Sequence, residues 1–222
     1  MDNSGHRERL RTRFLKSGHD AFADHELLEL LLMGVVLRRD VKPIAKALLS
    51  RFGNLNAVVA ASIPELTNVD GVGESIAIHL KAVHAILLRG EKENITKQPV
   101  LSSWASLLNY LKLDLEHEKR EQFRVLFLDK KLRLIKDEMM GDGTIDHAPV
   151  YPREIARRAL ELSSSSVVLV HNHPSGDAKP SPQDIVMTKK IITALEQIEV
   201  KVIDHIIVGF EGSVSMKAIG LC

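Results

Sequence analysis

The chain has almost no cysteine, and this shortage narrows the chemistry that it can support. Its 222 residues include one cysteine, Cys222. A disulfide within the chain needs two thiols, and a cysteine-built zinc site needs several thiolates. Both are therefore excluded, and any metal ion must be held by His, Asp or Glu side chains.

Long apolar segments are absent as well. The longest is residues 27–37, LLELLLMGVVL, which Glu29 interrupts. It is too short to cross a bilayer, because a membrane-spanning helix needs about 20 apolar residues. The first residues, MDNSGHRERLRTRF, are charged and have no apolar core of the kind found in secretory signals. We therefore expect no membrane partner and a cytoplasmic location.

An excess of one charge is also missing. The chain has 30 Lys and Arg residues against 29 Asp and Glu residues, a net charge of +1. Broad basic surfaces dominate non-specific nucleic-acid binding, so this balance of charge disfavours a protein whose only function is to bind DNA. The arginines at positions 7, 9, 11 and 13 could touch phosphates, and a solvated helix face explains them equally well.

The sequence is organised as two domains. Residues 1–92 carry mostly helical periodicity and predict a small all-α domain. Residues 93–101 lie in a polar stretch with Pro99 and no strong period, which predicts a linker. In residues 102–222, alternating and buried-type strand patterns interleave with helix patterns. We therefore expect the second domain to be an α/β sandwich with a mixed sheet.

The segment 64–88 predicts two helices joined by the tight turn VDGVG, with the second helix ending near Leu88. This segment resembles a helix-hairpin-helix, whose backbone N–H groups contact a DNA phosphate without reading the base sequence. The candidate contact residues are Gly71, Val72 and Gly73. Alternatively, the glycines only permit a sharp turn between packed helices, and the flanking Asp70 and Glu74 oppose an anion.

Residues 171–184, HNHPSGDAKPSPQD, hold the most informative pattern. Side chains at positions i and i+2 of a strand face the same way, so His171 and His173 should project together while Asn172 faces away. The following turn leads to a helix whose first turn carries Asp184. Three ligands of His, His and Asp type with one open position are typical of a catalytic zinc site.

Each part of this pattern also has a structural explanation. Ser181 and Asp184 have the spacing of a helix capping box, and the helix dipole favours an acidic residue in a first turn. Histidines at a strand end can simply be half-exposed. The conjunction of all the parts is what favours a metal site.

The complete spacing, His-x-His-x7-Ser-x2-Asp, is similar to the signature of the JAMM (MPN+) metalloprotease superfamily. The stretch HNHPSG resembles that of the RadC family, bacterial proteins that join a helical N-terminal region to a JAMM-type domain. The likeness extends over nearly the whole chain, including the motifs ELLELLL from Glu26, FLD ending at Asp129, PREIARRAL and DHIIVG.

The resemblance implies further site residues. A JAMM site requires an upstream glutamate as general base, at the start of the first strand beside the metal. Glu121, which heads EQFRVLFLD, fits that position, and Glu118 is the competitor. Ser181 would donate its hydroxyl to the oxyanion that forms during amide hydrolysis. His205, in DHIIVG, is either packed in a strand or a partner of a ligand, and we do not expect it to bind metal itself.

Two function classes follow. The first is a Zn²⁺-dependent hydrolase that cuts a peptide or isopeptide bond in a peptide or protein substrate. The second is a non-catalytic module in DNA repair that binds protein or makes non-specific DNA contacts through the N-terminal domain. The two are compatible within one chain.

Overall fold

A computed structural model describes residues 4–143 and 150–222 of the chain. The chain divides into two compact units, Met1–Leu87 and Leu88–Cys222. Each unit has its own hydrophobic core, and each is considered by itself below.

The first unit is entirely helical within its described residues, as the sequence predicts. Its elements are α1 (Ser4–Ser17), the 3-10 turn η1 (His19–Ala21), α2 (Asp24–Leu32), α3 (Lys42–Phe52), α4 (Leu55–Ala60), α5 (Ile63–Thr67) and the start of α6 (Glu74–Lys97). Local signals set several of the boundaries. Ser62 caps α5 in a reciprocal capping box with Glu65, and Gly53, at φ +90°, ends α3.

Helix α6 is longer than expected. The sequence predicts an end near Leu88 and a linker at 93–101, but the helix continues to Lys97. Its last turns belong to the second unit, where Ile95 is fully buried in the core with Val100. Packing of these two apolar residues outweighs the polar composition and the cost of Gly90 within a helix, about 1 kcal/mol. The first half of the predicted linker is therefore helical.

The second unit is built around one five-stranded sheet. Its elements are α7 (Trp104–Leu115), β1 (Gln122–Leu128), β2 (Leu134–Asp142), α8 (Pro152–Glu161), β3 (Ser166–Asn172), α9 (Pro182–Glu196), β4 (Lys201–Gly209) and β5 (Gly212–Ser215). The strand order is β2-β1-β3-β4-β5. Strands β3 and β4 are parallel and the other neighbours are antiparallel, so the sheet is mixed, as predicted.

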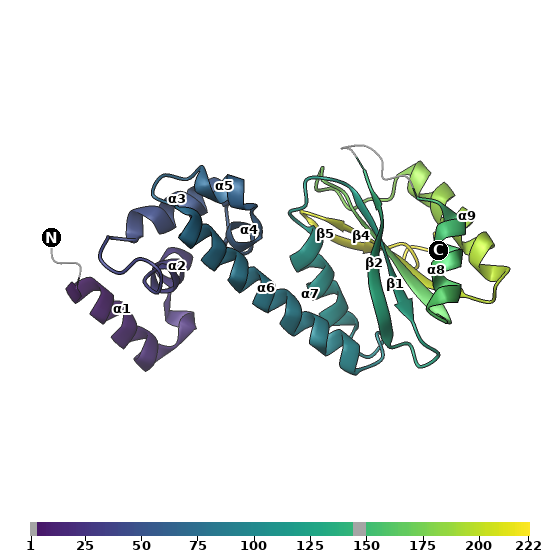
Figure 1. The fold of residues 1–222 in the computed structure, drawn as a ribbon, viewed down its shortest axis with the longest axis horizontal. Coiled ribbons are helices and arrows are strands. Elements are labelled where there is room, and N and C mark those ends of the chain that lie inside the picture. Colours follow the sequence, from purple (N-terminus) through teal and green to yellow (C-terminus); the bar gives the residue numbers. More distant parts are fainter. Residues whose placement is uncertain (1–3, 144–149) are drawn as a thin grey trace. The chain divides into compact units, whose positions relative to one another are not determined.

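The sheet separates two cores, and the alternation of side chains along each strand decides which core a residue joins. On β3, Val168 and Val170 pack with the apolar residues of α7, whereas Val167 and Leu169 pack with those of α8 and α9. Figure 1 shows α7 on one side of the sheet and α8 beside α9 on the other. The same parity places position 171, at the end of β3, on the side of α9.

Within the described residues, no helix has the length and apolar character needed to cross a membrane.

Candidate metal centre

The two histidines of the HNHPSG stretch converge, as the strand period predicts. His171 belongs to the end pair of the β1–β3 ladder, where it lies opposite Phe123 of β1, and it is 1% exposed. His173 lies just beyond the strand and is half-buried. Their Nε2 atoms are 2.9 Å apart. The ring of Phe123 stacks on that of His171 at 6.1 Å between centroids, which fixes one side of the site.

The loop after His173 is held against the end of β4. The His173 N–H donates to the Val208 carbonyl at 2.8 Å, and the Gly176 N–H donates back to the His173 carbonyl at 2.9 Å. Gly176 has φ +94°, a conformation that glycine adopts at little cost. Gly209 permits the close approach, because a Cβ there would collide with the Gly176 carbonyl and lie 2.8 Å from the Ala178 nitrogen.

Asp184 enters from the first turn of α9, as predicted. Its Oδ1 lies 3.2 Å from His171 Nε2, and its Oδ2 lies 3.5 Å from His173 Nε2. The capping box is present as well: Asp184 Oδ2 accepts the Ser181 N–H at 2.6 Å, and Ser181 Oγ accepts the Asp184 N–H at 3.2 Å. The structural and the metal-binding explanations of this pair therefore coexist in one arrangement.

The donor set fits a metal ion. One ligand atom from each of His171, His173 and Asp184 lies within 4.8 Å of the others. His173 Nδ1 is 2.7 Å from the Asp177 carbonyl, an acceptor, so Nδ1 carries the proton and Nε2 presents a lone pair. Facing lone pairs repel unless a cation lies between them. Ligands of a tetrahedral zinc ion are separated by about 3.3 Å, and the separations here are 2.9, 3.2 and 3.5 Å.

The pKa values reflect the same crowding of acceptors. Burial opposes ionisation of Asp184, but the adjacent His171 and His173 imidazoles outweigh it and hold its pKa well below the ordinary range. The adjacent Asp184 carboxylate raises the pKa of His173 against the effect of burial, and the charge of Glu121 adds to the rise. The cluster therefore attracts a proton or another cation.

Two buried residues lie beneath the cluster: His205, which the sequence offers as packed in a strand or as a partner of a ligand, and Thr188, which sequence reasoning did not assign. His205 of β4 is fully buried, and its Nε2 is 2.8 Å from His171 Nδ1. Thr188 of α9, also fully buried, places Oγ1 2.6 Å from His205 Nδ1. Burial, together with the neighbouring His171, lowers the pKa of His205 well below its ordinary value. The sequence shows Thr188 one helical turn after Asp184, but only the pairing of β3 with β4 reveals its partner.

The candidate bases lie on the segment before β1. Glu121 immediately precedes the strand and is half-buried, and its charge acts on His173. Glu118 is exposed, and its carboxylate accepts a hydrogen bond from Gln122 Nε2 at 3.3 Å. Asn172 faces away from the histidines, as predicted. Its amide donates to the Glu118 and Arg120 carbonyls and accepts from the Gln122 N–H, so it fixes the backbone on both sides of Glu121.

The predicted DNA-contact residues form the turn between α5 and α6. Gly71 has φ +82°, and its carbonyl accepts a hydrogen bond from Arg39 at 2.7 Å. The Val72 N–H already donates to Val69, and the Val72 side chain is buried in the core of the unit. Gly73 is exposed, and its carbonyl accepts the first hydrogen bonds of α6.

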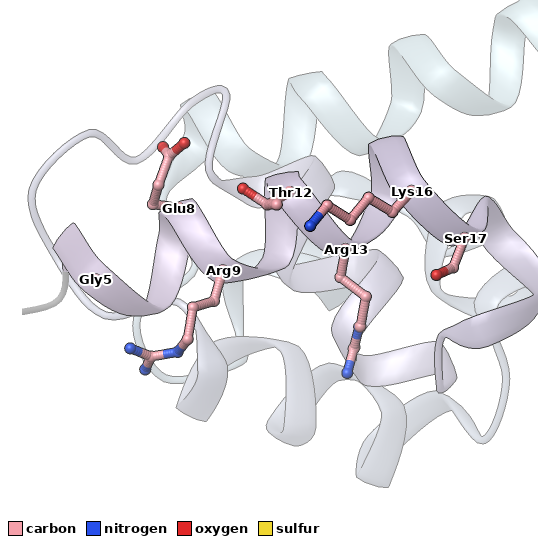
Figure 2. A pocket seen from close by; sticks show the side chains of 7 residues that line it. All are labelled: Gly5, Glu8, Arg9, Thr12, Arg13, Lys16 and Ser17. Carbon is pink, nitrogen blue, oxygen red and sulfur yellow. The ribbon is translucent and has the colours of Figure 1, made fainter.

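Some of the N-terminal arginines are used within the first unit. Arg7 donates to the Val36 and Arg39 carbonyls, and Arg13 pairs with Glu26. Figure 2 shows the side chains that line a pocket on α1, where cations mix with the carboxylate of Glu8; the lining residues are Gly5, Glu8, Arg9, Thr12, Arg13, Lys16 and Ser17. The pocket contains none of the candidate metal-site or hairpin residues, but it includes two of the arginines that could touch phosphates.

Comparison with protein families agrees with both units. The model described as the RadC-like JAB domain matches residues 101–221, more than half of the chain. The chain belongs to the RadC family. A second model, described as UPF0758 N-terminal, matches residues 1–78. The RadC-like JAB domain thus includes β3, α9 and the whole histidine and aspartate cluster, and the helical residues before it have their own family match.

Proposed function

We propose that this RadC-family chain is a zinc-dependent hydrolase of JAMM type, which binds Zn²⁺ through His171, His173 and Asp184 and cleaves a peptide or isopeptide bond. The observation that carries the proposal is the convergence of two imidazole nitrogens and a carboxylate within 4.8 Å. This set provides three protein ligands and leaves a fourth position open, as catalytic zinc sites do. When bound, zinc supplies a water of lowered pKa and polarises the scissile carbonyl.

Glu121 is the general base of this proposal. Its carboxylate would accept a proton from the attacking water and return it to the leaving amine. Two observations favour it over Glu118. The charge of Glu121 acts on His173, and Glu121 is half-buried beside β1, whereas Glu118 is exposed and its carboxylate accepts a hydrogen bond from Gln122.

Ser181 is the proposed oxyanion donor. Its Oγ accepts a hydrogen bond from the Asp184 N–H, which uses a lone pair and leaves the hydroxyl hydrogen free to be donated. Its place at the start of α9, next to the ligand Asp184, puts this hydrogen near a substrate carbonyl bound at the cluster. Capping and catalysis therefore make no conflicting demand on the side chain.

Metal content tests the ligand assignment. We expect the purified full chain to contain about one zinc ion per molecule, as a mononuclear site of this type does, and the His173→Ala variant to contain almost none. Elemental analysis of both proteins at matched purity is the measurement. Equal zinc in the two would end the proposal.

A substrate-trapping experiment tests the base. Glu121→Gln should keep its zinc but lose the proton acceptor, so it should retain bound substrate protein that the wild type releases. Glu118→Gln is the matched control and should behave as the wild type. If Glu118→Gln traps substrate and Glu121→Gln does not, the assignment of the base is reversed.

The hairpin supports a second candidate function, non-specific DNA contact in a repair setting. The supporting observation is that Gly73, which immediately precedes α6, is exposed. The positive end of a helix dipole therefore lies at the surface of the turn. DNA binding by the full chain should weaken as salt rises. Gly73→Asp should reduce it further than Gly90→Asp, which changes another exposed residue of the same helix. Equal binding by the two variants would exclude the hairpin as the contact.

A further inference from the structure

Behind the proposed metal ligands, buried polar groups form an unbroken chain. Thr188 Oγ1 lies 2.6 Å from His205 Nδ1, and His205 Nε2 lies 2.8 Å from His171 Nδ1. Thr188 Oγ1 is also 2.6 Å from the main-chain carbonyl of Asp184. Thr188 and His205 are fully buried and His171 is 1% exposed, so water does not compete for these contacts. The chain of contacts therefore begins at one proposed ligand residue and ends at another.

The direction of every hydrogen in this chain follows from one contact. The Asp184 carbonyl offers only lone pairs, and the Thr188 hydroxyl has a single hydrogen. At 2.6 Å the hydroxyl must donate to the carbonyl, since otherwise two oxygen lone pairs would face each other in a dry interior. Thr188 Oγ1 is then left to accept a hydrogen bond from His205 Nδ1–H.

The remaining steps are set by the imidazole ring itself. A neutral imidazole carries one N–H, so when His205 Nδ1 donates to Thr188, His205 Nε2 is an acceptor. It accepts from His171 Nδ1–H at 2.8 Å. His171 Nε2 then holds a lone pair, and this is the nitrogen that faces His173 and Asp184.

We propose that Thr188 and His205 are positioning residues, which hold the His171 ring in the Nδ1–H tautomer and so prepare Nε2 to bind a divalent metal. His173 reaches the same tautomer by a separate device, the Asp177 carbonyl in the surface loop. The tautomer of His171 is therefore fixed by buried residues, and that of His173 is fixed by the loop. The inference rests on the proposed function for the assignment of His171 as a metal ligand, but the tautomer of its ring can be measured in the metal-free protein.

The tautomers can be measured without any activity. At a pH high enough that the cluster carries no added proton, the metal-free, ¹⁵N-labelled full chain should show, in a long-range ¹H–¹⁵N correlation spectrum, His171 and His205 each protonated at Nδ1 and unprotonated at Nε2. His171→Gln and His205→Gln spectra assign the two rings. A His171 ring that is protonated at Nε2, or that averages between tautomers, would overturn the proposal.

Metal affinity tests the consequence for binding. Thr188→Val keeps the shape of the side chain and removes the acceptor, and we expect it to weaken Zn²⁺ binding about 10–100-fold in competition with a chromophoric chelator. Thr188→Ser should restore affinity to near the wild-type value. Thr193→Val is the matched control, because Thr193 lies on the same helix, is exposed, and donates to a main-chain carbonyl four residues back. Thr188→Val with wild-type affinity and an unchanged His171 spectrum would refute the positioning role.

The two proposals fail separately. A wild-type chain that binds no zinc would refute the metal site, whereas the spectrum would still decide the tautomer. A zinc-binding chain with the opposite His171 tautomer would refute the positioning role of Thr188 and His205 and leave the metal site intact. Thermal unfolding of each variant shows whether its fold is retained.

Discussion

At the scale of single residues, adjacent positions at the end of β3 face opposite sides of the sheet. His171 and His173 face α9 and the proposed ligand cluster, and Asn172 between them faces the other way. Asn172 is 1% exposed and satisfies three backbone groups of the segment that carries Glu121. Two of the three proposed ligands and the support for the proposed base are thus encoded in three consecutive residues.

Asn172→Ala should destabilise the second unit by about 2 kcal/mol, because it removes three hydrogen bonds that the buried Asn172 amide makes with the main chain. Zinc binding should persist, since the ligands are unchanged, while hydrolysis should fall because Glu121 loses its fixed backbone. Denaturant unfolding and metal analysis measure the first two effects. Asn109→Ala, an exposed substitution on α7, should change stability by less than about 0.5 kcal/mol. Equal effects of the two would contradict the role of Asn172.

Most of the site could be predicted from local sequence. The strand period places His171 and His173 together, and the capping spacing brings Asp184 to the start of α9. Thr188 was not found in this way, and the two alternatives for His205 stayed open, because His205 meets His171 only through the parallel pairing of β3 with β4, which joins residues far apart in the chain. Local periodicity carries no information on strand order.

At the scale of elements, the ligand loop depends on close backbone contact with the end of β4. Gly209→Ala should destabilise the second unit by about 1–3 kcal/mol and weaken zinc binding, because the added methyl group must displace the backbone near Gly176. Gly90→Ala is the contrasting control, since it meets no atom within 4 Å and should stabilise α6 by up to about 1 kcal/mol. Chemical denaturation and zinc titration distinguish the two. Unchanged zinc affinity in Gly209→Ala would show that the loop tolerates a shift.

An ion pair links α8 to the edge strand β2. Arg158 donates two hydrogen bonds of 2.6 Å to Glu138, and these lower the pKa of the Glu138 carboxyl against a small effect of burial. A lowered pKa gives stability that is present above the ordinary value of about 4.3 and is lost as pH falls through the folded value. In a double-mutant cycle of Glu138→Gln with Arg158→Gln, the coupling should be small and favourable at neutral pH and should vanish in acid. A coupling that grows in acid would contradict this sign.

Helix α6 shows where element boundaries escape local patterns. Its early turns have clear apolar periodicity, but the stretch GEKENITK has the composition of a linker. The helix continues because Ile95 is buried in the second unit's core, and that burial depends on residues more than ten positions away. Helix α3, Lys42–Phe52, is the contrary case, because its end is set locally by Gly53.

At the scale of the whole molecule, the chain divides into two compact units, and the proposed metal site lies in the second. Zinc at 100 times its dissociation constant should stabilise that unit by about 2.7 kcal/mol. Calorimetry with zinc and with a chelator should therefore shift the unfolding of residues 88–222 and leave that of residues 1–87 unchanged, with His173→Ala as the insensitive control. A shift of both transitions, or of neither, would contradict this expectation.

The capping box also has a consequence for metal selectivity. One oxygen of Asp184 is already held by the Ser181 N–H, so a cation at the cluster meets one unshared carboxylate oxygen and two imidazole nitrogens. Magnesium and calcium require six or more ligands that are nearly all oxygen, and they leave water reluctantly for nitrogen. A helix cap would thereby discriminate against the two divalent ions that are most abundant in cells.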